Sequence, residues 1–339
     1  MGDELRALCA FGLAALLALL LVPLAWRIAI RTGFLDHPVD YKAHGAATPY
    51  LGGAAVIASF AISAIAFGGA ATRLWLVLAL AVALAAIGSF DDRRTLPPGL
   101  RFGAQVLAAV ALYAADVRWE VTGSAWVDLP VTLVWVAGLA NAYNLLDNID
   151  GAAATTAAVS AAGIGALALA RGDGALAACG FALAGSCATF LVFNLARPAR
   201  IFLGDGGSVP IGFLIAALAL LAAGPLGGDA VLIAVPLAGV AIFDTTLVVI
   251  SRSRRGVTIL TGGRDHSTHR LLRPLGSPRR VALLLAAAQA ALCAVTLLIW
   301  DASETTVLIA AAAYIALGLS LLAVFERPGL AAAAEGGSA

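Results

Sequence analysis

The chain has 339 residues, of which 61% are hydrophobic and only 12% charged, and its mean hydropathy is +0.96. Soluble domains carry about 25% charged residues, so this composition excludes an ordinary soluble protein and indicates a chain whose solvent is lipid. The net charge of +1 excludes a general electrostatic attraction to nucleic acid.

Apolar stretches of about 20 residues, long enough to cross a bilayer as helices, follow one another along the chain. Eleven are predicted, with ten as the alternative count: 7–30, 51–70, 73–90, 102–119, 130–146, 151–170, 174–195, 208–224, 230–251, 281–299 and 305–325. The first lacks a small-residue cleavage site and is predicted to remain as a span. The sequence therefore predicts an all-α polytopic membrane protein with one transmembrane domain, 1–327, and a disordered cytoplasmic tail, 328–339.

The basic residues predict how the chain crosses the membrane. With the N-terminus outside and the C-terminus in the cytoplasm, all but four of the 21 lysines and arginines fall on the cytoplasmic side. The connections on that side are also long and rich in Asp, Asn, His and Gly, whereas the outer connections are short. The active site is therefore predicted in the cytoplasmic loops.

The first polar stretch on that side, residues 36–44, contains Lys42, the only lysine of the chain, and His44. A compact ammonium on a flexible stem suits a phosphate or a uracil carbonyl. Both residues are candidates for substrate binding. The alternative for Lys42 is an anchor at the membrane boundary.

The second stretch closes the third predicted span with Asp91 and Asp92. Two adjacent carboxylates repel each other, so they need a cation or a nearby arginine. We treat the two acids as candidate catalytic residues. The alternative is a solvated helix end that is paired with Arg93 and Arg94.

The third stretch places polar residues at every third position, with Asn141, Asn144 and Asp147 in one stripe of a helix. Asp150 follows at the start of the next span. The two amides and Asp150 are candidates for substrate binding, and Asp147 is a candidate for catalysis and for metal binding. A polar packing seam between helices is the alternative.

The fourth stretch runs from Phe202 through Gly204 and Asp205 to Ser208, directly before a span. Glycine lets the backbone approach a ligand, and a helix N-terminus favours phosphate. An aspartate in that turn is well placed to hold Mg²⁺ on a pyrophosphate. The alternative is an ordinary glycine-rich turn.

The fifth stretch is the loop 252–280, which contains Arg264, His266, His269 and Arg270. Two histidines without a third ligand make a poor zinc site, so basic groups beside a phosphate are the better interpretation. The histidines are candidate catalytic residues, and the two arginines are candidates for substrate binding. An incidental basic loop is the alternative.

Five motifs in this order resemble those of the polyprenyl-phosphate N-acetylhexosamine-1-phosphate transferases. They read DHPVDYKAHGAATPYLGG, DDRRTLPPGLRFGAQ, NAYNLLDNIDG, FLGDGGS and GGRDHSTHRL, and the matched region runs from about residue 33 to 275. Five ordered motifs are far more specific than any one of them.

The resemblance implies roles for individual positions. Asp91 and Asp92 are similar to the acidic pair near the metal and the lipid phosphate, and Asp205 to the magnesium ligand. Residues similar to those that contact the nucleotide, the pyrophosphate and the sugar are Lys42, Asn144, Asp147, Asp150, Phe202, His266 and His269, with Phe202 stacking on uracil. Mg²⁺ is the implied cofactor, with Mn²⁺ as the alternative.

The implied reaction takes place in the inner (plasma) membrane. An oxygen of undecaprenyl or decaprenyl phosphate attacks the β-phosphate of a UDP-N-acetylhexosamine, UMP leaves, and the lipid-linked sugar initiates a cell-envelope glycan. The bilayer is a partner, nucleic acid is not, and a homodimer is left open as an oligomeric state.

The last loop departs from one branch of the family. The branch that uses phospho-MurNAc-pentapeptide carries three consecutive histidines, where this chain has His266-Ser267-Thr268-His269. This difference favours the N-acetylglucosamine branch and leaves MurNAc-pentapeptide as the alternative donor. In addition, Tyr41 replaces a common arginine and Asn148 a frequent glycine.

Three other classes of membrane protein fit less well. A transporter would place polar residues near the bilayer midplane and usually shows two related halves. An intramembrane aspartyl protease would need glycine where Phe202 stands. A CDP-alcohol phosphotransferase would need an arginine and further aspartates after Asp150-Gly151, where Ala152-Ala153 follow.

Overall fold

The computed structural model describes residues 1–36, 47–69, 71–224, 227–258 and 263–327. The predicted substrate-binding residues Lys42 and His44, and the predicted tail 328–339, lie outside the described residues.

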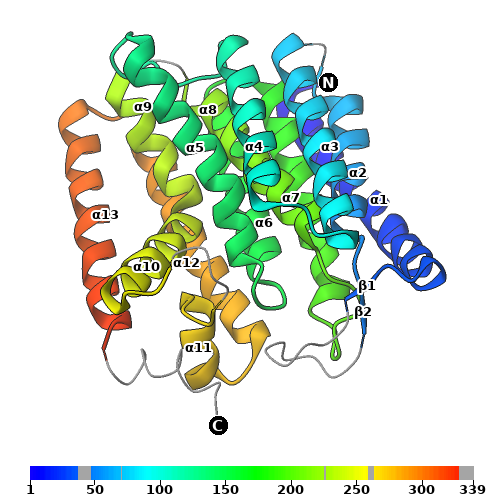
Figure 1. The fold of residues 1–339 in the computed structure, drawn as a ribbon. Coiled ribbons are helices and arrows are strands. Elements are labelled where there is room, and N and C mark those ends of the chain that lie inside the picture. Colours follow the sequence, from blue (N-terminus) through cyan, green and yellow to red (C-terminus); the bar gives the residue numbers. More distant parts are fainter. Residues whose placement is uncertain (37–46, 70, 225–226, 259–262, 328–339) are drawn as a thin grey trace.

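Helices make up nearly all of the described chain (Figure 1). In chain order the elements are α1 (Asp3–Thr32), β1 (Leu35–Asp36), β2 (Thr48–Pro49), α2 (Gly52–Phe67), α3 (Thr72–Arg93), α4 (Pro98–Ala114), α5 (Ala125–Leu146), α6 (Ala152–Ala170), α7 (Gly174–Asn194), α8 (Asp205–Ala223), α9 (Gly227–Ala234), the 3₁₀ turn η1 (Val235–Ala238), α10 (Gly239–Arg255), α11 (Ser267–Leu275), α12 (Pro278–Ile299) and α13 (Glu304–Phe325). Each predicted span coincides with a helix or, for 230–251, with α9, η1 and α10 in succession.

Nine helical segments of the described chain are long and apolar enough to cross a membrane, with 230–255 counted as one. The helices α2 and α4 are shorter, with 16 and 17 residues. The all-α polytopic membrane fold is confirmed. Its only strands among the described residues are β1 and β2, an antiparallel pair of two residues each that the sequence did not predict.

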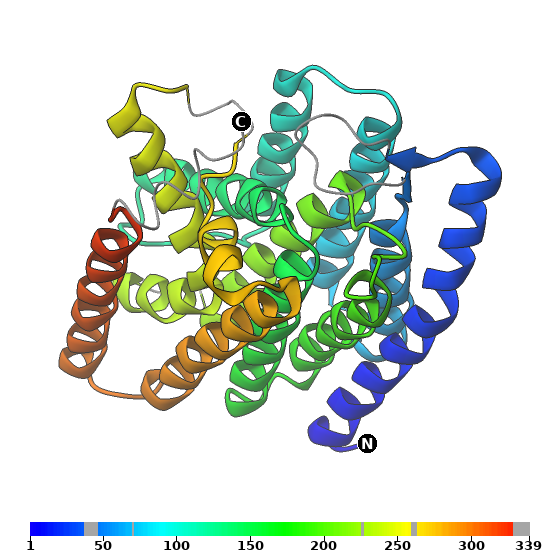
Figure 2. The same cartoon turned by 90° about the horizontal axis from the view of Figure 1, so that it is seen from below.

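The helix α8 lies at the centre of the bundle and α13 at its rim. The most apolar window of α8 is 89% buried, against 6% for α13. Around α8 pack α2, α3, α5 and α6. Seen from below, α1 and α13 lie along opposite edges of the bundle (Figure 2). The N-terminus of α8 is therefore held on several sides by protein.

Glycines bring the first turn of α8 against its neighbours. A Cβ added to Gly88 of α3 would lie 2.4 Å from the carbonyl oxygen of Asp205, and one added to Gly53 of α2 would lie 2.2 Å from the nitrogen of Gly207. Small residues allow such close backbone contact between membrane helices. Three helix ends consequently meet at this turn.

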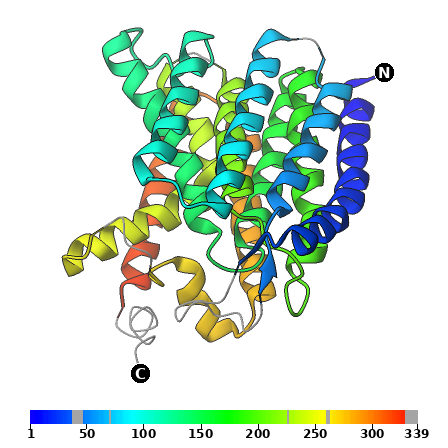
Figure 3. The ribbon, with the colours of Figure 1, turned by 45° about the vertical axis from the view of Figure 1, so that its right-hand side comes forward.

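The ninth predicted span is broken near its middle. Pro236 in η1 cannot donate a backbone hydrogen bond, which favours a break. Gln289 of α12, which is fully buried, donates to the carbonyls of Pro236 (2.9 Å) and Leu237 (3.0 Å) and accepts from the N–H of Val240 (3.1 Å). The broken backbone is thus satisfied by a side chain, and α10 departs from the bundle at an angle (Figure 3).

Candidate functional site

Asp205 is the first residue of α8, and polar side chains from α3, α4 and α5 meet there. One carboxylate oxygen accepts from Asn144 Nδ2 (2.7 Å) and the other from Arg101 Nη1 (2.9 Å). The same Asn144 amide donates to Ser208 Oγ at 3.0 Å. The predicted metal ligand and the predicted amide therefore lie together.

Asp91 and Asp92 reach the same place from the last turn of α3. Asp92 accepts the N–H groups of Asp205 (2.9 Å) and Gly206 (3.1 Å), so it caps α8 from another helix and satisfies N–H groups that have no partner within α8. Asp91 accepts from Arg101 Nη1 at 2.7 Å. The adjacent acids thus have different partners.

The arginine that pairs with Asp91 is Arg101, and not Arg93 or Arg94, which belong to the alternative interpretation of this stretch. Among the described contacts, Arg101 bridges Asp91 and Asp205, whereas the Arg93 guanidinium lies over the Phe34 ring, 5.7 Å from its centroid. A turn between α3 and α4 returns Arg101 to the acids, and sequence distance alone concealed this contact. Ser208 was also missed as a partner of the site.

Asp147 follows α5 directly and lies beside the first turn of α8. Burial raises its pKa well above the usual value, and the charges of Asp205, Asp92 and Asp150 raise it further, against an opposing hydrogen bond from the Gly204 N–H. The predicted acids therefore lie close enough for their charges to interact. Gly204 itself adopts a φ of +71°, and a Cβ there would lie 2.6 Å from Asp92 Oδ2, so this turn requires glycine.

The first residue of the predicted polar stripe has a different environment. Asn141 donates to Gln105 of α4 and to the carbonyl of Ala137 at 2.8 Å. Gln105 is only 4% exposed. The stripe thus divides between a seam that joins α4 to α5 and the Asp205 cluster.

Phe202, the predicted uracil-stacking residue, precedes the glycine turn and is partly buried. Its ring centroid lies 6.3 Å from that of Tyr50, and its carbonyl accepts from the N–H of Gly52. Burial, followed by the Asp36 carboxylate, raises the pKa of Tyr50, which favours a neutral phenol. An aromatic pair therefore borders the acidic cluster.

His266 and His269 lie where α11 begins, with ring centroids 6.1 Å apart. Asp244 of α10, fully buried, is hydrogen-bonded to His266 Nδ1 at 2.8 Å and accepts the N–H of Ser267 at 2.8 Å. The sequence assigned no role to Asp244, since its partner is 22 residues away. Asp244 orients the first histidine and caps α11.

His269 is kept neutral by its surroundings. Burial, then the neighbouring His266 and Arg264, lower its pKa to about 4. Its Nδ1 is buried and has no hydrogen-bond partner among the described atoms. A neutral ring with a free nitrogen can accept a proton or a hydrogen bond from a ligand.

One contact joins the histidine segment to the residues beside Asp147, and two ion pairs hold it to α10. Thr268, fully buried between the histidines, donates to Asn148, which follows Asp147. Asp265 pairs with Arg252 (2.8 Å) and Arg255, and these bonds outweigh burial and lower its pKa.

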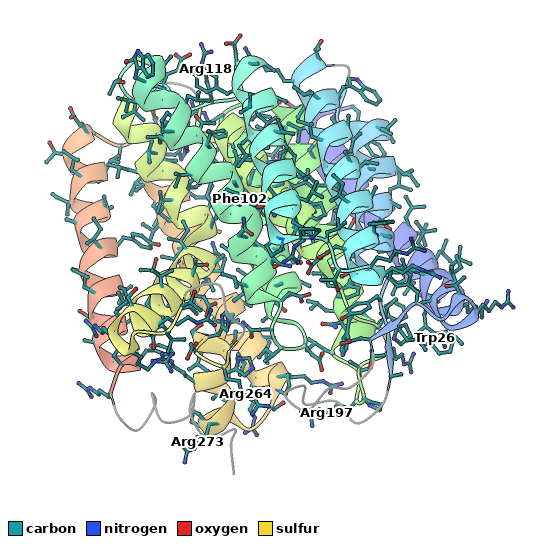
Figure 4. The ribbon with its side chains drawn as sticks, in the orientation of Figure 1. Trp26, Phe102, Arg118, Arg197, Arg264 and Arg273 are labelled. Atoms are coloured by element: carbon teal, nitrogen blue, oxygen red, sulfur yellow. The ribbon has the colours of Figure 1, made fainter. Side chains whose placement is uncertain are left out.

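The two arginines predicted to bind substrate differ in exposure. Arg264 is exposed at the site end, near Arg197 and Arg273, whereas Arg118 lies at the opposite end of the bundle (Figure 4). Arg270 is fully buried and hydrogen-bonded to protein. Only the first of them faces outward in this structure.

The described side chains that gather here supply oxygen donors. Four carboxylates gather here, those of Asp91, Asp92, Asp147 and Asp205, and the Arg101 guanidinium pairs with two of them, Asp91 and Asp205. Hard oxygen donors with excess negative charge are what Mg²⁺ requires, together with substrate phosphates. In the described chain, no group of three or more acids, histidines or cysteines is placed so that it could hold a metal ion by itself.

Comparisons with known proteins identify the relatives of this chain. Residues 74–223 match Glycosyl transferase family 4. The chain is 30% identical to a decaprenyl-phosphate N-acetylglucosaminephosphotransferase of Mycolicibacterium smegmatis, over 96% of this chain and 91% of the relative. It is 29% identical to a probable undecaprenyl-phosphate N-acetylglucosaminyl 1-phosphate transferase of Bacillus subtilis, over 84% and 83%. It is also 33% identical to a phospho-N-acetylmuramoyl-pentapeptide-transferase of Moorella thermoacetica, over 64% and 76%.

Proposed function

The chain belongs to Glycosyl transferase family 4, and we propose that it transfers N-acetylglucosamine 1-phosphate from UDP-N-acetylglucosamine to polyprenyl phosphate, releasing UMP. The observation that carries this proposal is the meeting of Asp205, Asp92, Asn144 and Arg101 at the first turn of a central membrane helix. A lipid phosphate held in the bilayer and a nucleotide from water can both reach such a helix end. The names of the relatives favour this reaction over transport.

Mg²⁺, with Mn²⁺ as the alternative, fits the donor set. Asp205 and Asp147 would hold it, because their carboxylates lie in the acidic cluster with only Arg101 as a described neutralising partner. When bound, the ion would neutralise the pyrophosphate of the donor.

The residues of the chain position the reactants. Asp92 fixes the Gly204–Gly206 turn, whose position at a helix N-terminus favours phosphate. Arg101 sets the place of Asp91 beside Asp205, and an oxygen of the lipid phosphate attacks the β-phosphorus as the bond to UMP breaks. Because a phosphate monoester is already an anion near neutral pH, positioning and charge neutralisation are the main requirements.

Other predicted residues surround this centre in the proposal. Phe202 and Asp150 border the nucleotide, while His266, His269 and Arg264 approach the sugar and the phosphates; Asn141, predicted to bind substrate, instead joins α5 to α4 through Gln105. Lys42 and His44 complete the nucleotide site from outside the described residues. The site faces the cytoplasm in this proposal, with the N-terminus on the other side of the plasma membrane.

The test measures UMP release by purified protein in detergent with undecaprenyl phosphate, Mg²⁺ and a panel of UDP-sugars. Wild type should release UMP with UDP-N-acetylglucosamine, and Asp205→Ala should not. Asp173→Ala is the matched control, because Asp173 also starts a helix, α7, and accepts the Leu176 N–H at 2.9 Å, but at the opposite end of the bundle.

Each outcome has a distinct meaning. UMP release with UDP-MurNAc-pentapeptide alone would replace the donor in the proposal. No release with any UDP-sugar, where a known transferase is active, would refute it. Chelation of divalent ions should abolish activity, and Mg²⁺ should restore it.

A further inference from the structure

Arg270, directly after His269 on α11, is a charged side chain that is fully buried. A guanidinium removed from water must be matched by acceptors, since an unpaired buried charge is strongly destabilising. The partners of Arg270 therefore reveal what its burial achieves.

These partners come from three different elements. Arg270 Nε donates to the carbonyl of Asp265 (3.0 Å), just before α11, and Nη2 donates to Ser251 Oγ of α10 (2.8 Å). Nη1 donates to the carbonyl of Phe325 (2.6 Å), the last residue of α13, and to Glu326 Oε1 (2.9 Å). One side chain thus ties α10, α11 and α13 together.

The C-terminal end of α13 is fixed by contacts that the rest of this helix lacks. Within α13, Val307 is the one buried residue. At the C-terminal end, in contrast, the Phe325 ring centroid lies 5.6 Å from that of Phe243 on α10, and Glu326 pairs with Arg270. A cation at a helix C-terminus also satisfies free carbonyls and the helix dipole.

The residues that contact the end of α13, Phe243 and Arg270, are neighbours in sequence of residues that form or hold the histidine pair. Phe243 precedes Asp244, which holds His266, and Arg270 follows His269. A shift of the α13 end would therefore be transmitted to both histidines through packed and hydrogen-bonded neighbours.

We infer that Glu326 is a positioning residue that acts through Arg270 and fixes the histidine-bearing helix α11 for catalysis. Its role in catalysis rests on the proposed function, since the histidines are placed there beside the donor sugar and phosphates. Arg254 also approaches Glu326, at 3.5 Å, but this arginine is 66% exposed and adds little.

The test compares Glu326→Ala, Glu326→Gln and Arg273→Ala. Glu326→Ala should lower kcat about tenfold and leave KM for the UDP-sugar within about twofold, because a misplaced catalytic group affects the transition state more than ground-state binding. Glu326→Gln keeps an oxygen acceptor for Arg270 and should restore most of kcat. Arg273 is exposed on the same helix, so Arg273→Ala should resemble wild type.

Hydrogen exchange of residues 263–275 gives a readout that does not require the enzymatic reaction. Glu326→Ala should accelerate exchange there about tenfold, equivalent to a loss of about 1.4 kcal/mol of local protection, and Arg273→Ala should not. If Glu326→Ala left both the exchange of residues 263–275 and kcat unchanged, the inference would be overturned. It would also be overturned if the variant raised KM and accelerated exchange equally along the whole chain, because Glu326 would then stabilise the fold in general and not α11 in particular. Inactivity of the wild type would count against the proposed function, and the exchange comparison would still decide whether Glu326 fixes α11.

Discussion

Gln289→Met should destabilise the protein, because Gln289 supplies the hydrogen bonds that the break between η1 and α10 lacks. Its side chain is fully buried and makes three bonds to backbone groups, at Pro236, Leu237 and Val240. A side-chain hydrogen bond within a membrane protein stabilises it by about 0.6 kcal/mol on average and up to ~1.7. Loss of three bonds therefore lowers the free energy of unfolding by about 2–5 kcal/mol.

Thermal unfolding in detergent, followed by tryptophan fluorescence, measures this effect. At roughly 2 °C per kcal/mol for a chain of this size, Tm should fall by about 4–10 °C. Leu298→Ala is the control, since Leu298 lies on the same helix and is 81% exposed. A Tm of Gln289→Met within about 1 °C of wild type would show that the backbone at the break finds other partners, and would refute the reasoning.

Two further predictions concern the site. Gly88→Ala places a Cβ 2.4 Å from the Asp205 carbonyl oxygen, so it should displace the first turn of α8 and reduce UMP release at least ~100-fold. The control is Gly103→Ala, where a Cβ meets nothing within 4 Å and UMP release should be unchanged. Equal activities of the two variants would contradict the role given to the close approach of Gly88 to α8. His269, whose pKa is about 4, should stay neutral until the pH falls to that value, and NMR of labelled histidines can test this. An unfolded histidine binds its proton near pH 6.5, so the free energy of unfolding should fall as the pH drops from about 6.5 towards 4. His269→Gln should remove that part of the pH dependence. A His269 signal that titrates near pH 6.5 would contradict this prediction.

Hydropathy predicted the helices well because the bilayer imposes a length and a composition on every spanning segment. All eleven predicted spans coincide with helices, and even the broken one was located. The break itself was not predicted, because Pro236 alone does not reveal that Gln289, 53 residues away, satisfies the freed carbonyls. Hydropathy shows that a segment is excluded from water, but it does not show which side chains of other helices contact it.

The site was predicted in its residue types more than in its pairings. The motif acids Asp91, Asp92, Asp147 and Asp205 do gather around one turn, as their positions at helix ends indicated. The choice of Arg101 over Arg93 as the neutralising arginine depends on the turn that joins α3 to α4. Such contacts are set by the packing of whole helices, which no local pattern contains.

The placement of the site at helix ends follows from the energetics of a membrane protein. Charged groups are costly in the hydrocarbon region, so carboxylates that must meet a lipid phosphate are tolerated where helices end and donors are free. Asp92 capping α8 and Asp244 capping α11 use the same device, an acid from one helix that satisfies the N–H groups at the start of another. In both cases the capped turn carries the residue proposed to act, Asp205 in one and His266 in the other. The same hydrogen bonds that complete each helix therefore also fix the reactive side chain, and a substitution that removes either cap should impair folding and catalysis together.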